Sequence, residues 1–205
     1  MIGLLGGTFD PVHLGHLDVA RAALQTLSLE RVLFIPAHIP PHRGVPQASA
    51  ADRLAMVQLA IKGEPRFEAS TIELDAAGPS YTAVTIDRFL AQGYGKDDLC
   101  FIAGADAFAG VTTWFDYPAL LDRCRFAVVS RPGFPAPAVA QQIPAFAEHM
   151  TDIFLIDAPT APVSSTGVRA SIDRGAPLTG LVPDLVAGYI DANRLYTTEA
   201  HGHCS

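Results

Sequence analysis

The chain has 205 residues, of which 49% are hydrophobic, and its formal net charge at pH 7 is −7. This length suits one domain with a proper core, and the acidic balance argues against a nucleic-acid-binding protein that works through a broad basic surface. No apolar run reaches the ~18 residues that a membrane-spanning helix needs, and no basic segment precedes the first apolar run, so we expect neither a membrane partner nor a signal peptide.

Apolar strand-like runs alternate with helix-like segments along the chain. The expected strands are residues 1–5, 31–37, 67–74, 99–103, 125–130 and 152–156. The expected helices are residues 17–27, 51–61, 81–90, 118–123, 168–174 and 184–192, and residues 135–146 are expected to be part helix and part loop. This alternation predicts right-handed crossovers and a mainly parallel sheet with helices on both faces, which is a doubly wound, Rossmann-like α/β fold.

We expect residues 1–196 to form one domain, in which the helices from about residue 165 make a small C-terminal subregion. In parallel sheets of this kind, ligands bind beyond the carboxyl ends of the strands, where the strand order switches. The distinctive segments of this chain all follow predicted strands, at residues 6–16, 40–43, 104–106 and 131–133. They are therefore expected to meet at one edge of the sheet.

The segment G-G-T-F-D-P-V-H-L-G-H, residues 6–16, joins the first strand to the first helix. Free amides and the dipole at a helix start favour phosphate, and Gly6 and Gly7 allow a close backbone approach. His13 and His16 share one face of the helix start and can donate hydrogen bonds to phosphate oxygens. The pattern is neither G-x-G-x-x-G nor the Walker sequence, so histidine is expected to take the cationic role. The alternative is a plain turn with two incidental histidines.

A second phosphate site is predicted at S-S-T-G-V-R, residues 164–169, between the sixth strand and a helix. Hydroxyls and free amides at the helix start, with Arg169 one turn further on, suit an anion; an ordinary cap with a solvated arginine is the alternative. Arg43 follows the second strand in a loop stiffened by prolines, from which it could reach a triphosphate. The alternative is a surface loop.

Two further segments could contact a substrate. Ser80 is expected to cap the helix over residues 81–90, where free amides could meet a substrate carboxylate; a capping role alone is the alternative. Trp114 is the only tryptophan, in a segment without clear periodicity. It could stack on an aromatic ring or pack in the core.

Three cysteines, Cys100, Cys124 and Cys204, are scattered along the chain. The first two lie in or near apolar runs, which favours free buried thiols and a cytoplasmic location. The tail 201–204, H-G-H-C, could bind a metal ion, but a disordered terminus over residues 197–205 is the preferred interpretation. No metal ligands are therefore assigned to the chain.

Together these segments resemble the H-x-G-H nucleotidylyltransferase superfamily, and most closely the bacterial nicotinate mononucleotide adenylyltransferases. The resemblance extends from Gly6 to the last helix, nearly the full length. It implies adenylyl transfer from Mg·ATP to nicotinate mononucleotide, giving deamido-NAD and pyrophosphate. Pantetheine-phosphate adenylyltransferases, cytidylyltransferases and a non-catalytic nucleotide-binding module remain as alternatives, and the oligomeric state, a homo-oligomer included, is open.

The resemblance also implies roles for individual residues. The ATP phosphates would be held by Gly6, Gly7, Thr8, Phe9, His13 and His16, with help from Arg43. The adenylate side and the departing pyrophosphate would contact Ser165, Thr166 and Arg169, and the nucleotide would contact Gly104 and Asp106. The nicotinate substrate would meet Thr82, Ala83, Trp114, Phe115 and Arg131. The family often has tyrosine where this chain has Phe115, which matters only if a hydroxyl is used. His13, His16 and Arg169 are the expected catalytic residues, and Mg²⁺ is expected to arrive with ATP.

Overall fold

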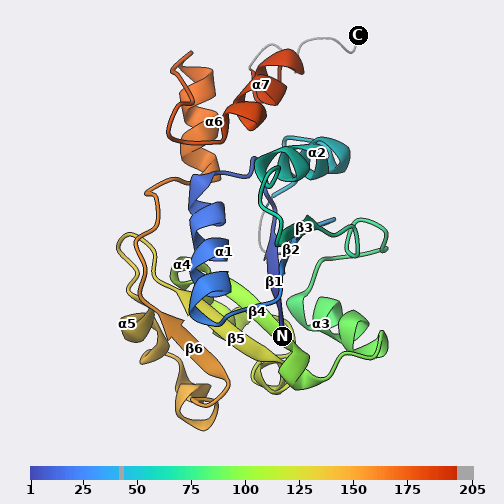
Figure 1. The fold of residues 1–205 in the computed structure, drawn as a ribbon, viewed down its shortest axis with the longest axis vertical. Coiled ribbons are helices and arrows are strands. Elements are labelled where there is room, and N and C mark those ends of the chain that lie inside the picture. Colours follow the sequence, from blue (N-terminus) through green and yellow to red (C-terminus); the bar gives the residue numbers. More distant parts are fainter. Residues whose placement is uncertain (42–43, 198–205) are drawn as a thin grey trace.

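The structure, a computed structural model, describes residues 1–41 and 44–197. Six parallel strands form one sheet in the order β3-β2-β1-β4-β5-β6, as Figure 1 shows. The strands are β1 (Ile2–Gly7), β2 (Val32–Pro36), β3 (Phe67–Ala69), β4 (Leu99–Gly104), β5 (Arg125–Val129) and β6 (Ile153–Ile156). The predicted parallel α/β fold is confirmed, and the strand order switches between β1 and β4.

Seven α-helices are present among the described residues. They are α1 (Leu14–Thr26), α2 (Ala50–Ala60), α3 (Thr82–Ala91), α4 (Ala105–Phe108), α5 (Ala136–Ala140), α6 (Ser165–Asp173) and α7 (Asp184–Ala192). Short 3₁₀ helices occur at Lys96–Asp98, Val111–Thr113, Ala119–Asp122 and Pro144–Glu148. None of the helices in the described part of the chain is long and apolar enough to cross a membrane.

Side chains alternate between the two faces of the sheet, as the pleat requires. In β1, Leu5 belongs to the core that includes residues of α1, α2, α6 and α7, whereas Leu4 belongs to the core under α3, α4 and α5. Helices therefore cover both faces, as predicted. Helices α6 and α7 lie together at the end of the molecule toward which β1 runs (Figure 1).

Several predicted boundaries are wrong. The third strand ends at Ala69 instead of residue 74, because the chain turns at Thr71, whose hydroxyl donates to the Asp75 carboxylate at 2.6 Å. Residues 118–123 form a 3₁₀ helix over Ala119–Asp122 instead of an α-helix. Helices α1 and α6 each begin three residues earlier than expected. The predicted tail, apart from Thr197, lies outside the described residues.

Candidate active site

A cleft of about 500 Å³ opens at the carboxyl ends of β1 and β4, at the switch in strand order. Its walls come from the turn after β1, the start of α3, the segment after β4 and the residues before α6. The predicted site residues that line it are Gly6, Gly7, Thr8, Phe9, His13, His16, Thr82, Gly104, Asp106, Trp114, Phe115, Arg131 and Ser165. Ala83, Thr166 and Arg169 are not among the lining residues, and Arg43 lies outside the described residues.

The turn after β1 is shaped by Phe9, which is buried and has a left-handed φ of 51°. A Cβ at Gly7 would lie 2.9 Å from the Phe9 ring, so this glycine is needed for packing within the turn itself. The Phe9 ring also meets His16 edge-on, with 4.9 Å between ring centroids. The sequence interpretation gave both glycines to phosphate approach alone, and the packing of Phe9 adds a second reason for Gly7.

The two histidines stack on each other at the start of α1, with ring centroids 3.6 Å apart and planes 22° apart. The backbone N–H of His13 donates to Nδ1 of His16 at 3.2 Å. Because Nδ1 of His16 is an acceptor, the neutral imidazole carries its proton on Nε2. In this form Nε2 is the ring nitrogen of His16 that can donate a hydrogen bond.

His13 is only 4% exposed. Burial, with a further contribution from the positive charge of Arg131, lowers the pKa of His13 from 6.5 to about 3. Without a bound anion this imidazole is therefore uncharged at neutral pH, so the predicted cationic role of His13 would depend on the bound phosphates. A neutral imidazole can still donate one hydrogen bond, and a polyanion bound beside it would raise its pKa.

Arg131 lines the cleft but uses most of its donors on the protein. Its guanidinium donates to the carbonyl oxygen of Val163 at 2.8 Å and to that of Ala161 at 3.2 Å, and its Nε lies 4.0 Å from the Asp106 carboxylate. It therefore ties the loop before α6 to the end of β5. The sequence placed Arg131 with the substrate; these contacts give it a structural function as well.

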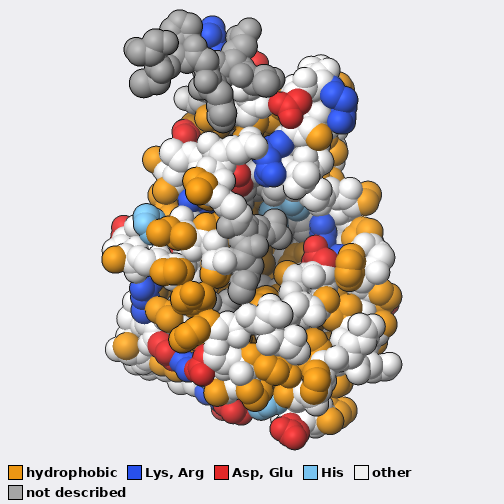
Figure 2. Space-filling model, turned by 180° about the vertical axis from the view of Figure 1, so that it is seen from behind, with side chains coloured by type: hydrophobic (Ala, Val, Ile, Leu, Met, Phe, Trp, Pro, Cys, Tyr) orange, Lys and Arg blue, Asp and Glu red, His pale blue; other side chains and the backbone are white. Residues whose placement is uncertain are grey.

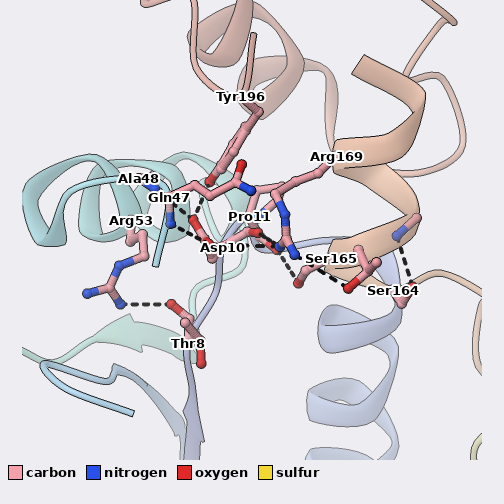
Figure 3. A network of polar contacts seen from close by, with 12 residues as sticks. Thr8, Asp10, Pro11, Gln47, Ala48, Arg53, Ser164, Ser165, Arg169 and Tyr196 are labelled. Atoms are coloured by element: carbon pink, nitrogen blue, oxygen red, sulfur yellow. Dashed lines mark hydrogen bonds and ion pairs between the residues drawn. The ribbon is translucent and has the colours of Figure 1, made fainter. Parts of the chain in front are cut away.

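The predicted second phosphate element is joined directly to the first (Figure 3). Ser164 caps α6, with its hydroxyl accepting from the Gly167 N–H at 3.1 Å. The Ser165 hydroxyl donates to the Pro11 carbonyl at 2.9 Å, and Nη1 of Arg169 donates to the Asp10 carbonyl at 2.6 Å. The two motifs, about 155 residues apart in sequence, thus form one continuous structure around the turn after β1.

Tyr81, Trp114 and Phe115 also line the cleft. Trp114 packs edge-on against Phe101 and Phe108, with ring centroids 6.0 and 6.4 Å away, so it belongs to the core as well as to the cleft. Phe115 is 53% exposed and stacks on Tyr81 at 4.7 Å. Helix α3 begins beside this pair at Thr82. Ser80 does not cap it, because its hydroxyl accepts from the His38 N–H at 2.8 Å and Tyr81 occupies the cap position.

Sequence reasoning missed Glu73, a buried carboxyl that lines the cleft. The Thr85 hydroxyl donates to it at 2.5 Å. Burial raises the pKa of Glu73, and hydrogen bonds from Thr85 and Ser80 partly oppose the shift. The sequence signal that could have found it is a glutamate between two apolar residues, I-E-L at residues 72–74.

Asp10 and Arg53 were missed as well. Asp10 lies inside the first motif but received no role, although a carboxylate in an otherwise apolar turn needs partners. Arg53 lies on the buried face of α2, together with Met56 and Val57. An arginine at that helical spacing is a sign of a buried polar contact.

The family model for cytidylyltransferase-like proteins matches residues 4–171. The chain is 44% identical over 198 residues to the probable nicotinate-nucleotide adenylyltransferase of Roseiflexus sp. (strain RS-1), covering 95% of this chain and 97% of that protein. It is 39% identical over 204 residues to the protein of the same name from Hydrogenovibrio crunogenus, and this match covers 96% of this chain and 97% of that protein.

The fold is similar to that of Plasmodium falciparum nicotinic acid mononucleotide adenylyltransferase solved in complex with NaAD. The TM-score is 0.76 at 17% identity, and the match covers 95% of this chain and 96% of that one. At this identity the likeness supports the fold.

Proposed function

Since the chain belongs to the cytidylyltransferase-like family, and within it to the nicotinate-nucleotide adenylyltransferases, we propose that it transfers the adenylyl group of ATP to nicotinate mononucleotide. The products are deamido-NAD and pyrophosphate. The observation that carries the proposal is the stacked His13–His16 pair, which shares one cleft with Ser165 and Trp114. The cleft thus has donors for a phosphate chain and an aromatic side chain for a pyridine ring.

The proposed step is attack by the phosphate of nicotinate mononucleotide on the α-phosphorus of ATP. A new P–O bond forms as the bond to pyrophosphate breaks. A phosphate monoester has a second pKa of about 6 and is mostly dianionic at neutral pH, so the reaction needs no general base. Catalysis then depends on positioning and on stabilising charge.

His16 is proposed to donate from Nε2 to an α-phosphoryl oxygen, since its Nδ1 is occupied by the His13 N–H. His13 supports it as a second donor. Thr8 and Phe9 in the turn, with Ser165 at the start of α6, would hold the phosphate chain through hydroxyl and amide groups. Gly104 and Asp106 would contact the nucleotide.

Trp114 is proposed to stack on the nicotinate ring, and the amides at Thr82, Ala83 and Phe115 to receive its carboxylate. The first amides of α3 have no acceptor inside the helix and suit an anion. A contact through backbone amides needs no hydroxyl at position 115, so phenylalanine is compatible with this role.

Mg²⁺ is proposed to enter with ATP as Mg·ATP. Within residues 1–41 and 44–197, no group of three or more His, Cys, Asp or Glu side chains is placed to hold a metal ion. The ion is proposed to be carried by the phosphates of ATP, because Mg²⁺ commonly keeps several waters and binds through substrate phosphates.

The proposal places the reaction in the cytoplasm. Cys100 and Cys124 are free and buried, and burial raises the pKa of both thiols. Unpaired cysteines suit a reducing compartment.

On the face shown in Figure 2, the Lys and Arg side chains, drawn in blue, are scattered among side chains of other types. This distribution is consistent with a small-molecule substrate.

Pyrophosphate release from Mg·ATP tests the proposal, with nicotinate mononucleotide, phosphopantetheine or no acceptor in parallel reactions. Release that depends on nicotinate mononucleotide is expected. Release with phosphopantetheine alone would reassign the acceptor, and ATP binding without release in any reaction would indicate a binding module.

A further inference from the structure

We propose that Asp10 is a positioning residue, which fixes Arg169 and the turn at residues 8–11 in the arrangement that nucleotide phosphates require, and that Tyr196 locks it in place. The proposal rests on the proposed function for the identity of the nucleotide. Its structural basis is the buried polar cluster around Asp10 in Figure 3. Asp10, Arg169 and Tyr196 are not among the residues that line the cleft.

The Asp10 carboxylate is 6% exposed and is surrounded by donors. It accepts from the N–H groups of Gln47 at 2.9 Å and Ala48 at 3.0 Å, and from the Tyr196 hydroxyl at 2.9 Å. Nη1 of Arg169 lies 3.8 Å from its Oδ2. One side chain thus gathers the segment before α2, helix α6 and the segment after α7 around the turn.

Arg169 is bound to the same residue through the backbone. Its Nη1 donates to the Asp10 carbonyl at 2.6 Å, and its Nη2 lies 3.4 Å from the Thr166 hydroxyl. The arginine and the turn therefore cannot shift independently. In Asp10→Asn, Arg169 loses its ion pair, and one acceptor oxygen remains for the three donors of Gln47, Ala48 and Tyr196. The geometry of both predicted phosphate elements should therefore loosen together.

Arg53 holds the turn from the other side. It is 1% exposed, and its Nη1 donates to the carbonyl oxygens of Thr8 at 2.8 Å and Ala37 at 2.7 Å. Burial lowers the pKa of Arg53, and the charge of Asp10 opposes that shift. Two guanidinium groups around one carboxylate leave a net positive charge behind the turn, which favours a bound polyanion.

Tyr196 fixes the end of the described chain onto this cluster. Its hydroxyl is the donor to Oδ1 of Asp10, and its backbone adopts a left-handed φ of 64°. Such a conformation persists in a non-glycine residue only where the surroundings hold it. Burial and the neighbouring carboxylate raise the pKa of Tyr196, so it remains a donor at neutral pH.

The chain provides a matched control for this hydrogen bond. The Tyr189 hydroxyl donates to the Asp52 carboxylate at 2.9 Å, a bond that joins α7 to α2 and involves no residue of the turn. Tyr196→Phe and Tyr189→Phe therefore remove the same kind of bond, at the same distance, from different places. Only Tyr196→Phe should weaken binding of the nucleotide.

The test measures Mg·ATP binding by calorimetry without acceptor, and KM for each substrate, in the wild type, Asp10→Asn, Tyr196→Phe and Tyr189→Phe. Asp10→Asn should weaken ATP binding and raise its KM by about tenfold, the loss expected from one weakened charged contact. Tyr196→Phe should weaken ATP binding by about threefold. KM for nicotinate mononucleotide should stay within about twofold, and Tyr189→Phe should match the wild type.

Equally weakened binding of both substrates would indicate general destabilisation and overturn the proposal. Unchanged ATP binding in Asp10→Asn, or equal effects of the two tyrosine variants, would overturn it as well. If Asp10→Asn does not fold, the tyrosine pair decides the question. If the wild type binds ATP but releases no pyrophosphate, the proposed function fails, while the binding data still decide the role of Asp10. A wild type that binds no ATP overturns both.

Discussion

Gly15→Ala should destabilise the protein, although alanine normally favours a helix. Gly15 is the second residue of α1, inside the H-x-G-H motif. A Cβ at this position would lie 2.6 Å from Nη1 of Arg131, 3.0 Å from Nη2 and 3.2 Å from the Ala161 carbonyl oxygen. The guanidinium would have to move, and it is held there by Ala161 and Val163.

The size of the effect follows from these contacts. A hydrogen bond that involves a charged group contributes about 1.5–3 kcal/mol, so losing both bonds costs about 3–6 kcal/mol. Replacing glycine by alanine in a helix regains at most about 1 kcal/mol. The free energy of unfolding should therefore fall by about 2–5 kcal/mol.

Urea unfolding followed by circular dichroism measures this change, with Gly188→Ala as the control. Gly188 lies inside α7, and a Cβ there would meet no atom within 4 Å. Gly188→Ala should thus stabilise the protein by up to about 1 kcal/mol. The reasoning is refuted if Gly15→Ala leaves the unfolding free energy within about 0.5 kcal/mol of the wild type, or if both variants stabilise.

Three further predictions concern the cleft. His16→Ala should lower turnover by about 10²–10³-fold, the usual loss of one donor to a developing charge, with an unchanged circular dichroism spectrum; near-normal turnover would remove His16 from the mechanism. His13 has a pKa of about 3 in the folded protein, against about 6.5 for a histidine in an unfolded chain. The unfolded state therefore binds more protons between these values, and stability falls as pH drops below about 6.5, by up to about 1.4 kcal/mol per unit. Urea unfolding at pH 7.5 and 5.0 should show a smaller loss in His13→Gln, and equal losses would contradict the assignment. Because Trp114 is the only tryptophan, nicotinate mononucleotide should quench the intrinsic fluorescence, whereas quenching by Mg·ATP alone would argue against the stacking role.

The parallel sheet could be predicted because buried strands and amphipathic helices leave clear patterns in the sequence. The first residues of the helices could not be predicted in the same way, since capping and packing decide where a helix begins. Leu14 and Ser165 each begin a helix whose first turn contains glycine, where intrinsic propensity is weak. The third strand was overestimated because residues 70–74 continue an alternating pattern, while the local Thr71–Asp75 hydrogen bond turns the chain.

Most residues of the cleft could be predicted from the motifs, but their chemical state could not. The neutral form of His13 depends on burial and on Arg131, which lies 118 positions away in sequence (131 − 13). The residues that donate hydrogen bonds to the Asp10 carboxylate are 37, 38 and 186 positions away. Such contacts exist only once the fold brings distant segments together, so no local pattern contains them.

The most direct test of the central claim is a side-by-side measurement of kcat/KM for nicotinate mononucleotide and nicotinamide mononucleotide with saturating Mg·ATP. Amides at the start of α3 favour a carboxylate over a neutral amide, and a preference of about a hundredfold corresponds to about 2.7 kcal/mol. We predict at least that preference for the acid. Equal rates would contradict the assigned carboxylate site, and no pyrophosphate release with either acceptor would contradict the proposed reaction itself.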